Sequence, residues 1–357
     1  MVKQQILVVA LVAVSLCAIA VGVYMANNDD EPSGDITVTD ARGRAVALDG
    51  TPEKILAINC CSLELLSYFE SVNKAIAIDK DDAIVGDKTY TQAYKEFFSG
   101  LEKVDRSNVE GIIALDPDLI ITSTVDVGQL DKLQSDTGTP VFAINADVEF
   151  GNEMWYTQIE ALGKALGEEK RAGDIVKGVK VIIDDIRTSS VTGINGYACG
   201  MMFYGAGEFL KTSGDWLPFD NSGIKNVMKK NESGVGGQPY KTSLEAVMDK
   251  DIDCIFIDNS NLDAVVDEMK GYIADAGLSN DAITNGDIYN VCLYKKWGTQ
   301  FDAVLINCLY VTKTMNPEGY SWDFEDKADE VLELLYGDKV NYETMKSNGN
   351  GCGKITL

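Results

Sequence analysis

The sequence contains no histidine, and this absence excludes several classes of functional site. Imidazole is the commonest zinc ligand and the commonest general base, so catalytic triads built on it, HExxH zinc sites and haem held by a proximal histidine are excluded in their usual forms. A CxxC spacing is also missing, which argues against a zinc or iron–sulfur site. We therefore expect no catalytic residue, no protein-bound metal and no cofactor.

Basic residues are scarce relative to acidic ones. The chain has 31 Lys and Arg against 56 Asp and Glu, a formal net charge of −25 over 357 residues. Because such a surface repels phosphate backbones, nucleic acid is not an expected partner. The charge favours solubility but does not select a fold.

The eight cysteines fall into different settings. Cys254, Cys292 and Cys308 stand among apolar residues, which predicts buried small hydrophobic side chains. The adjacent pair Cys60–Cys61 has three interpretations: free thiols near a ligand, a strained vicinal disulfide, or packing at the end of a strand. Cysteine pairing cannot be deduced from the sequence.

The N-terminal segment is strongly apolar. Residues 6–25 carry no charge, and twenty helical residues span a hydrocarbon core of about 30 Å. Lys3 precedes this run and acidic residues 29–31 follow it, which places the body outside the cytoplasm. A cleaved signal peptide normally has a shorter apolar region, so an uncleaved transmembrane anchor is favoured. A lipoprotein site at Cys17 is disfavoured because Leu16 precedes it.

Strand and helix patterns alternate along the rest of the chain. Residues 36–48 predict a hairpin, residues 54–59, 74–79, 118–123 and 140–145 predict buried strands, and helical patterns lie between the strands. Apolar residues then recur at helical spacing over 152–188, which predicts one long helix or a helix with a bend near Gly167 or Gly173. We expect an anchor or signal segment (1–26), a polar linker (27–35), an N-terminal α/β lobe (36–151), a connecting helix (152–188) and a C-terminal α/β lobe (189–357).

One sixteen-residue pattern occurs in both lobes. SNVEGIIALDPDLIIT (107–122) and TSLEAVMDKDIDCIFI (242–257) align Glu110 with Glu245. One interpretation is local: Ser107 with Glu110, and Thr242 with Glu245, fit the capping box at a helix N-terminus. The other is that each lobe presents one carboxylate to a two-subunit partner with basic sockets.

At this point the chain resembles the substrate-binding proteins of ABC importers for iron-siderophores, cobalamin and related metal chelates, the class III group with a single connecting helix. The resemblance rests on the order of TVTDARGRAVAL, PEKILAIN, VEGIIALDPDLIIT, VGGQPYKTSLEAVMDKDIDCIFI and KKWGTQFDAVLINCLYVTKTMNPEGY. It implies two Rossmann-like α/β lobes with mainly parallel sheets joined by one long α-helix. It also implies an ABC permease dimer with its ATPase as partners, with Glu110 and Glu245 docking onto permease arginines.

Ligands of open α/β sheets lie outside the carboxyl ends of the strands. The candidate ligand-binding residues in the loops there are Asn59, Cys60, Cys61, Ser62, Asp79, Lys80 and Ser123 in the first lobe, and Tyr204, Trp216, Tyr240, Asn259 and Trp297 in the second. The resemblance implies that the loops around 59–62 and Trp297 line the pocket. The aromatic rings could stack on a flat chelate or could pack at a lobe edge.

The expected ligand carries its own coordination shell, because the protein lacks imidazole. A ferric siderophore or a corrinoid fits this description, and a molybdate or tungstate oxyanion is the alternative. A membrane-anchored sensor with the same fold is a competing function. A chelatase-like enzyme is disfavoured, because no paired catalytic constellation is visible in the sequence.

Overall fold

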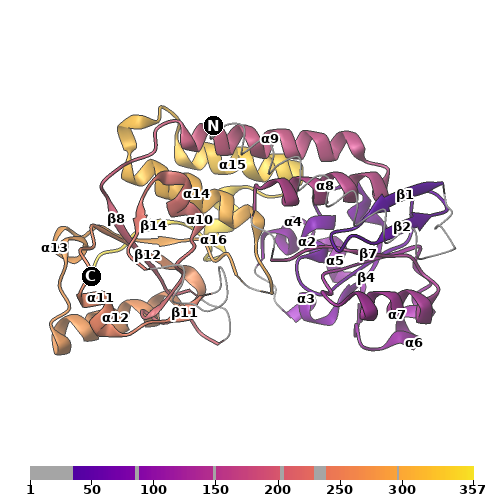
Figure 1. The fold of residues 1–357 in the computed structure, drawn as a ribbon, viewed down its shortest axis with the longest axis horizontal. Coiled ribbons are helices and arrows are strands. Elements are labelled where there is room, and N and C mark those ends of the chain that lie inside the picture. Colours follow the sequence, from indigo (N-terminus) through magenta and orange to yellow (C-terminus); the bar gives the residue numbers. More distant parts are fainter. Residues whose placement is uncertain (1–34, 85–87, 148–149, 202–204, 229–238, 296) are drawn as a thin grey trace, which may run out of the picture.

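The structure is a computed structural model that describes residues 35–84, 88–147, 150–201, 205–228, 239–295 and 297–357. The predicted anchor and nearly all of the predicted linker lie outside the described residues. Within the described ranges, no helix is both long and apolar enough to cross a membrane. The remaining chain forms two α/β lobes side by side (Figure 1).

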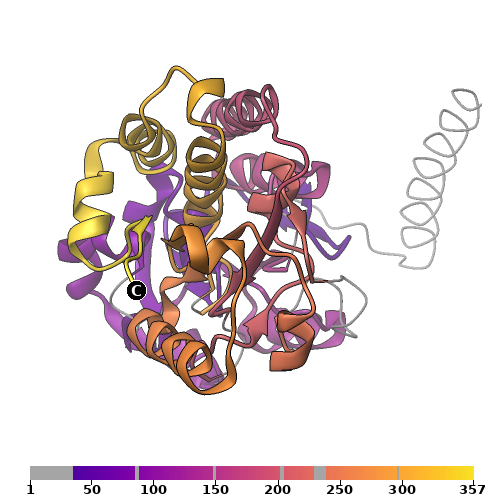
Figure 2. The same cartoon turned by 90° about the vertical axis from the view of Figure 1, so that its left-hand side faces the viewer.

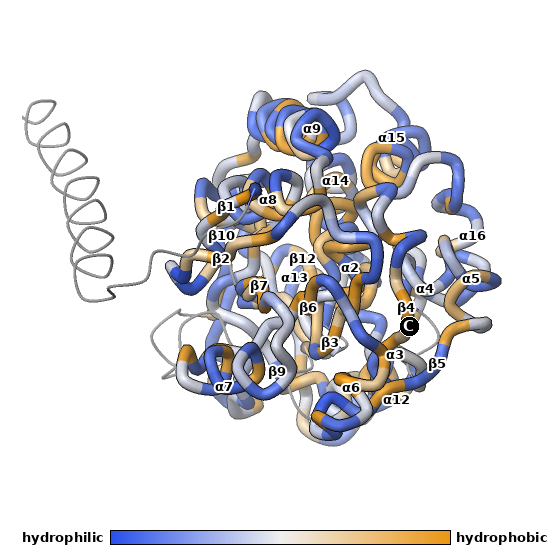
Figure 3. The backbone as a smooth tube through the Cα atoms, turned by 90° about the vertical axis from the view of Figure 1, so that its right-hand side faces the viewer, coloured by the Kyte–Doolittle hydropathy of each residue, from blue (hydrophilic) through white to orange (hydrophobic). Residues whose placement is uncertain are grey.

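The N-terminal lobe is built on a five-stranded parallel sheet in the order β5-β4-β3-β6-β7. The strands are β3 (Ile55–Ile58), β4 (Ala75–Asp79), β5 (Glu102–Val104), β6 (Leu119–Thr122) and β7 (Val141–Ala143). The central strands β3 and β6 are buried throughout and apolar except for Thr122, as expected for a sheet covered on both faces (Figure 3). The predicted hairpin is confirmed as β1 (Ile36–Thr39) and β2 (Ala45–Leu48).

The strand order places a topological switch point in this sheet. The chain runs outward from β3 through β4 to β5, then returns to the other side of β3 to form β6 and β7. In doubly wound sheets a crevice opens at the carboxyl ends of the two strands where the order reverses. Here those two strands are β3 and β6.

The C-terminal lobe has a seven-stranded mixed sheet. Its parallel centre is β8 (Asn195–Cys199), β12 (Cys254–Asp258) and β13 (Ile288–Val291). The shorter strands are β9 (Lys211–Thr212), β10 (Lys225–Asn226), β11 (Tyr240–Lys241) and β14 (Gly353–Lys354). Strand β14 pairs antiparallel with β13 and forms one edge of this sheet (Figure 2).

Helices flank both sheets. In the N-terminal lobe they are α2 (Ser62–Leu66), α3 (Lys80–Ile84), α4 (Thr89–Ala93), α5 (Lys95–Ser99), α6 (Val109–Leu115) and α7 (Val127–Thr137). In the C-terminal lobe they are α10 (Leu217–Ser222), α11 (Leu244–Met248), α12 (Leu262–Ala276), α13 (Asp281–Asn285), α14 (Phe301–Met315), α15 (Phe324–Tyr336) and α16 (Tyr342–Ser347).

The connection between the lobes differs from a single helix over 152–188. The chain forms α8 (Glu153–Leu166) and α9 (Glu169–Arg187), which meet at Gly167. Gly167 has φ +73°, and the Glu168 amide donates to the Gly163 carbonyl at 2.7 Å, so α8 ends in a left-handed glycine cap. Helix α9 folds back along α8, with Lys180 Nζ 3.9 Å from a Glu153 carboxylate oxygen. The prediction of one unbroken helix is therefore wrong. The alternative of a bend is confirmed, and the break lies at Gly167 and not at Gly173.

A shared hydrophobic core joins the lobes. One cluster of buried side chains contains Tyr68 and Phe69 from the first lobe, Trp155 from α8, and Phe301 and Tyr336 from the second. The rings of Tyr68 and Tyr336 meet edge to face, with centroids 5.5 Å apart. Because this core crosses the lobe boundary, we expect the lobes to move little relative to each other.

The repeated unit has a structural role that the sequence did not reveal. The Asp118 amide donates to the Lys54 carbonyl at 2.8 Å, while its carboxylate accepts the Lys54 amide at 2.9 Å. In the second copy the Asp253 amide donates to the Asn195 carbonyl at 2.8 Å, and its carboxylate accepts the Asn195 amide at 2.7 Å. Each aspartate therefore closes a two-bond ring at the start of a central strand.

The capping boxes predicted at Ser107 and Thr242 are wrong by one residue in both copies. The side chain of Asn108 accepts from the Gly111 amide and caps α6, and Ser243 accepts from the Ala246 amide and caps α11. Ser107 instead donates from its amide and hydroxyl to Asp105. Glu110 and Glu245 consequently lie at the second position of their helices, where neither forms the predicted box.

Replacing Asp253 should destabilise the fold more than replacing its neighbour Asp251. Asp253→Ala leaves the Asn195 amide without its carboxylate acceptor, so we expect a loss of about 1–2 kcal/mol in the free energy of unfolding. Asp251→Ala removes the same charge from an exposed position and should change stability by less than about 0.5 kcal/mol. Urea denaturation measures the free energy of unfolding of both variants. Equal losses of stability would contradict a structural role for the two hydrogen bonds between Asp253 and Asn195.

Candidate functional site

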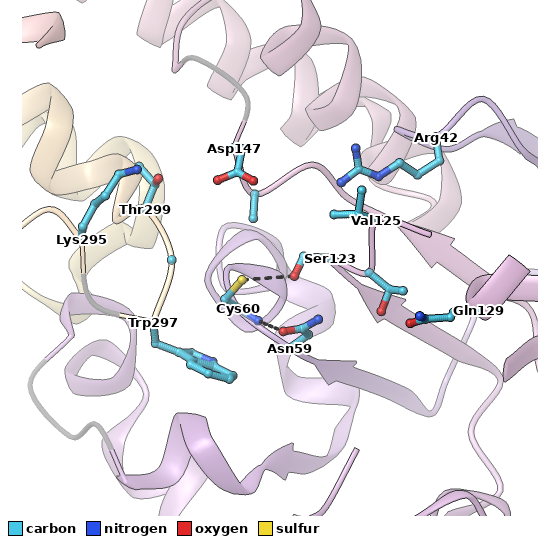
Figure 4. A pocket seen from close by; sticks show the side chains of 13 residues that line it. Arg42, Asn59, Cys60, Ser123, Val125, Gln129, Asp147, Lys295, Trp297 and Thr299 are labelled. Carbon is cyan, nitrogen blue, oxygen red and sulfur yellow. Dashed lines mark hydrogen bonds between the residues drawn. The ribbon is translucent and has the colours of Figure 1, made fainter. Parts of the chain in front are cut away.

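A cavity of about 620 Å³ lies between the lobes (Figure 4). Its residues are Arg42, Asn59, Cys60, Ser123, Thr124, Val125, Gln129, Ala146, Asp147, Lys295, Trp297, Gly298 and Thr299. The first-lobe residues come mainly from the loops after β3, β6 and β7, and the second-lobe residues come from one loop between β13 and α14. The cavity therefore opens at the switch point of the first sheet and faces a single loop of the second lobe.

Cys60 and Ser123 lie at the centre of the switch point. Cys60 follows β3, Ser123 follows β6, and the Cys60 sulfur is 3.2 Å from the Ser123 hydroxyl oxygen. Hydrogen bonding from Cys61, and then from Ser123, lowers the pKa of the Cys60 thiol to about 7 against the opposing effect of burial. A thiol with this pKa is partly ionised near neutrality and suits soft metals or electrophiles.

The backbone next to this thiol is held by a hydrogen bond to the buried Asp79. Asn59 and Cys61 have φ of +70° and +61°, a conformation uncommon in residues other than glycine. The buried Asp79 carboxylate accepts the Asn59 amide at 2.9 Å and binds Arg106 Nη1 at 3.1 Å. Asp79 therefore positions the loop after β3 and does not line the cavity.

The loop at 295–299 closes the cavity from the second lobe. The Arg106 guanidinium carbon lies 4.9 Å from the centre of the Trp297 ring, a cation–π contact between the lobes. Cys61 donates from its sulfur to the Thr299 carbonyl at 3.5 Å. A Cβ at Gly298 would lie 2.3 Å from the Cys61 sulfur, so this close approach requires glycine. Burial lowers the pKa of Lys295 in the same loop.

Four of the predicted ligand-binding residues line the cavity: Asn59, Cys60, Ser123 and Trp297. Cys60 and Cys61 are free thiols, so the vicinal disulfide is not formed in this structure. Cys61 and Ser62 lie buried behind the cavity wall. Lys80 pairs with Asp105 at 2.5 Å on the surface. Tyr204 lies outside the described residues.

The other second-lobe candidates lie elsewhere. Trp216 is 2% exposed and packs against Phe219 and Phe256, so its ring belongs to the core. Tyr240 belongs to β11 and pairs with β9. The Asn259 side-chain amide donates to the Gly351 carbonyl at 2.7 Å, which fixes the C-terminal segment. The predicted burial of Cys254, Cys292 and Cys308 is confirmed.

Sequence reasoning missed Arg42, Gln129 and Asp147 in the cavity wall. Arg42 lies in the turn of the β1–β2 hairpin, which is docked beside β7 by a 2.9 Å bond from the Ala41 amide to the Ala143 carbonyl. No local pattern in the sequence indicates that this hairpin reaches the switch point. Asp147 follows β7, and the rule that placed Ser123 after β6 could have found it.

Glu110 and Glu245 are both exposed, one in each lobe. Helices α6 and α11, which carry them, lie on the side of the molecule opposite to α9 and α15 (Figure 1). Hydrogen bonds from its own backbone amide and from Ser243 lower the pKa of Glu245. The two exposed glutamates thus belong to helices on the same side of the molecule.

The Cys60 thiol should be alkylated readily in the folded protein. We expect the rate of its reaction with iodoacetamide to reach half of its maximum near pH 7, because the thiolate is the reactive form. Ser123→Ala removes one hydrogen bond to the sulfur and should move this midpoint to higher pH. Peptide mass spectrometry over a pH series measures both. A midpoint near 9 in the unaltered chain would contradict the assignment.

Comparisons with known proteins give the family. Residues 68–291 match the periplasmic binding protein family. An uncharacterised ABC transporter substrate-binding lipoprotein, YvrC of Bacillus subtilis, is 29% identical over 162 residues, which are 44% of this chain and 48% of that protein. The chain therefore spans about half the length of the curated relative it matches.

Solved structures share the fold at low identity. A periplasmic solute-binding protein from Veillonella parvula has a TM-score of 0.68 at 16% identity, covering 87% of this chain and 95% of that one. The Haemophilus influenzae protein MolA bound to molybdate (TM-score 0.62, 16% identity, 86% and 99% covered) and Helicobacter pylori CeuE with Ni(II) bound (0.62, 16%, 88% and 99%) are also similar. With the match over 68–291 and these two lobes, the chain belongs to the periplasmic binding protein family.

Proposed function

We propose that the protein is the extracytoplasmic solute-binding component of an ABC importer, and that it captures a metal chelate between its lobes. The observation that carries the proposal is the cavity at the switch point of the first sheet, closed by one loop of the second lobe. Family membership and the name of the Bacillus relative support the transport role.

The size of the cavity favours a chelate over a bare oxyanion. Sites of about 300–1,000 Å³ typically enclose ligands of drug size. The cavity of about 620 Å³ lies in this range, whereas a tetrahedral oxyanion would leave most of it to water. A ferric siderophore is our first candidate, and a corrinoid is the second. Molybdate and tungstate remain outcomes of the binding test.

Two donor groups of the wall favour a ligand with oxygen acceptors. The wall carries charges of both signs, with Arg42 and Lys295 on opposite lobes and Asp147 beside them. Arg42 Nε and Trp297 Nε1 are buried, and within the described part of the chain neither has a hydrogen-bond partner. Because a buried donor without an acceptor costs free energy, a ligand that supplies acceptors to these two groups would gain affinity.

The exposed glutamates fit a docking role toward a permease dimer. Asp118 and Asp253 account structurally for part of the repeated unit, whereas Glu110 and Glu245 contribute no capping box. Both residues are exposed, and their helices lie on one side of the molecule, one in each lobe, which suits a partner with two-fold symmetry. Residues 6–25 would hold the body at the outer face of the membrane.

A panel of ligands tests the binding proposal. Titration calorimetry with a ferric tris-catecholate, a ferric hydroxamate, hydroxocobalamin and molybdate should give 1:1 binding of a ferric chelate without turnover. Arg42→Ala and Trp297→Ala should each weaken binding by about tenfold or more, a loss of about 1.4 kcal/mol. Trp322→Ala is the control, because Trp322 packs against Tyr320 away from the cavity. Tighter binding of molybdate than of any chelate in the panel would contradict the proposal that the ligand is a metal chelate.

Charge reversal tests the docking proposal. The double variant Glu110→Arg with Glu245→Arg should abolish uptake in cells that carry the cognate permease, because both carboxylate contacts become repulsive. Its affinity for the same ferric chelate should stay unchanged, since both residues are remote from the cavity. Glu153→Arg with Glu169→Arg makes equal charge changes in the first turns of α8 and α9 and should leave uptake intact. Normal uptake with the Glu110→Arg, Glu245→Arg double variant would contradict the docking role.

A further inference from the structure

Two cysteines that the binding site does not use lie side by side at the end of the chain. Cys292 directly follows β13 and is buried, while Cys352 directly precedes β14 and is half-buried. Their sulfur atoms are 3.5 Å apart. A disulfide requires an S–S bond of about 2.05 Å, so a small shift of the two side chains would bring the sulfurs within bonding distance.

The backbone around Cys352 is already held in place by other contacts. The Cys352 amide donates to the Tyr342 hydroxyl at 2.8 Å. The Gly351 carbonyl accepts from the side-chain amides of Asn259 and Asn290, each at 2.7 Å. The Leu293 amide donates to the Asn350 side chain at 2.6 Å. Because the segment is positioned without a sulfur–sulfur bond, closing that bond orders little additional chain.

We propose that Cys292 and Cys352 form a disulfide that fastens the C-terminal segment to the central part of the second sheet. The inference takes from the proposed function only the extracytoplasmic compartment, where disulfides persist. The bond would close a loop of about 60 residues and so restrict the unfolded chain. It would also tie down β13 immediately before the loop at 295–299, which supplies the second-lobe wall of the cavity.

The oxidation is a balanced thiol–disulfide exchange. The Cys352 thiolate, on the more exposed residue, attacks a low-molecular-weight or protein disulfide, and one thiol of that oxidant leaves. Cys292 then loses its proton and attacks the Cys352 sulfur, which forms the new S–S bond and releases the second thiol. Two cysteine thiols are oxidised to one disulfide, and one external disulfide is reduced to two thiols.

Peptide mapping tests the bond on the full chain. The folded protein is equilibrated with graded mixtures of reduced and oxidised glutathione, acid-quenched, alkylated and digested with trypsin. Cys292 and Cys352 then fall in separate peptides, 271–295 and 347–354. We expect these two peptides to become joined with the loss of two hydrogens, while Cys199 and Cys308 remain alkylatable. Oxidation of Cys60 with Cys61 would stay within peptide 55–74 and is read separately.

Matched variants separate the bond from general oxidation. Cys292→Ser and Cys352→Ser should each abolish the joined peptides, whereas Cys199→Ser, a buried thiol elsewhere in the same sheet, should retain them. Oxidation should raise the melting temperature by several degrees in the unaltered chain and in Cys199→Ser, but in neither of the other variants. The proposal is overturned if both thiols stay alkylatable in the most oxidising mixture, or if Cys352 stops at a mixed disulfide with glutathione.

Protein taken directly from cells tests the disulfide separately from the extracytoplasmic location on which the proposal rests. Protein recovered from cells under acid quench should already contain the joined peptides. Joining in glutathione together with free thiols in cells would support the geometry and contradict the extracytoplasmic location. A failed ligand or uptake experiment leaves the peptide map unaffected.

Discussion

One buried acidic side chain, Glu64, links the two lobes directly behind the cavity. Glu64 of α2 accepts from the Tyr68 hydroxyl and from the Phe301 amide, both at 2.7 Å. Phe301 begins α14, directly after the loop that closes the cavity, so this contact fixes that loop relative to Cys60. Burial, reinforced by nearby Asp302, raises the pKa of Glu64 well above its usual range. Burying the protonated, neutral side chain in this core costs less free energy than burying the carboxylate ion.

The repeated unit combines structural and surface roles. Asp118 and Asp253 bind the start of a central strand in each lobe, which explains why an aspartate at this place recurs in each copy. The glutamates eight residues earlier are solvent-exposed and take no part in these rings. Capping is carried by Asn108 and Ser243, one residue after the hydroxyl residues that the pattern suggested. The alignment thus identifies a shared fold element, and only the structure divides its residues by role.

Much of the fold could be predicted from the sequence, because buried strands of a parallel sheet are short apolar runs. The strands at 55–58 and 119–122 and the helix at 301–315 follow directly from such patterns. The break at Gly167 could not be chosen in advance, because Gly163, Gly173 and Gly178 lie inside the same two helices without ending them. Trp216 was misplaced for a similar reason: a large aromatic side chain has the same local pattern in a core as in a cleft. Arg42 was missed because only the tertiary docking of its hairpin brings it to the cavity.

The backbone geometry of the wall limits how such a site can diversify. Three of the four described residues other than glycine with positive φ are Asn59, Cys61 and Trp297, all at or directly behind the cavity. β-Branched side chains are poorly tolerated in that conformation, so few replacements are open there. Arg42, Ser123 and Gln129 have no such restriction. Substitutions that alter ligand preference should therefore be better tolerated in the hairpin turn and the β6–α7 connection than in the β3 loop or at Trp297.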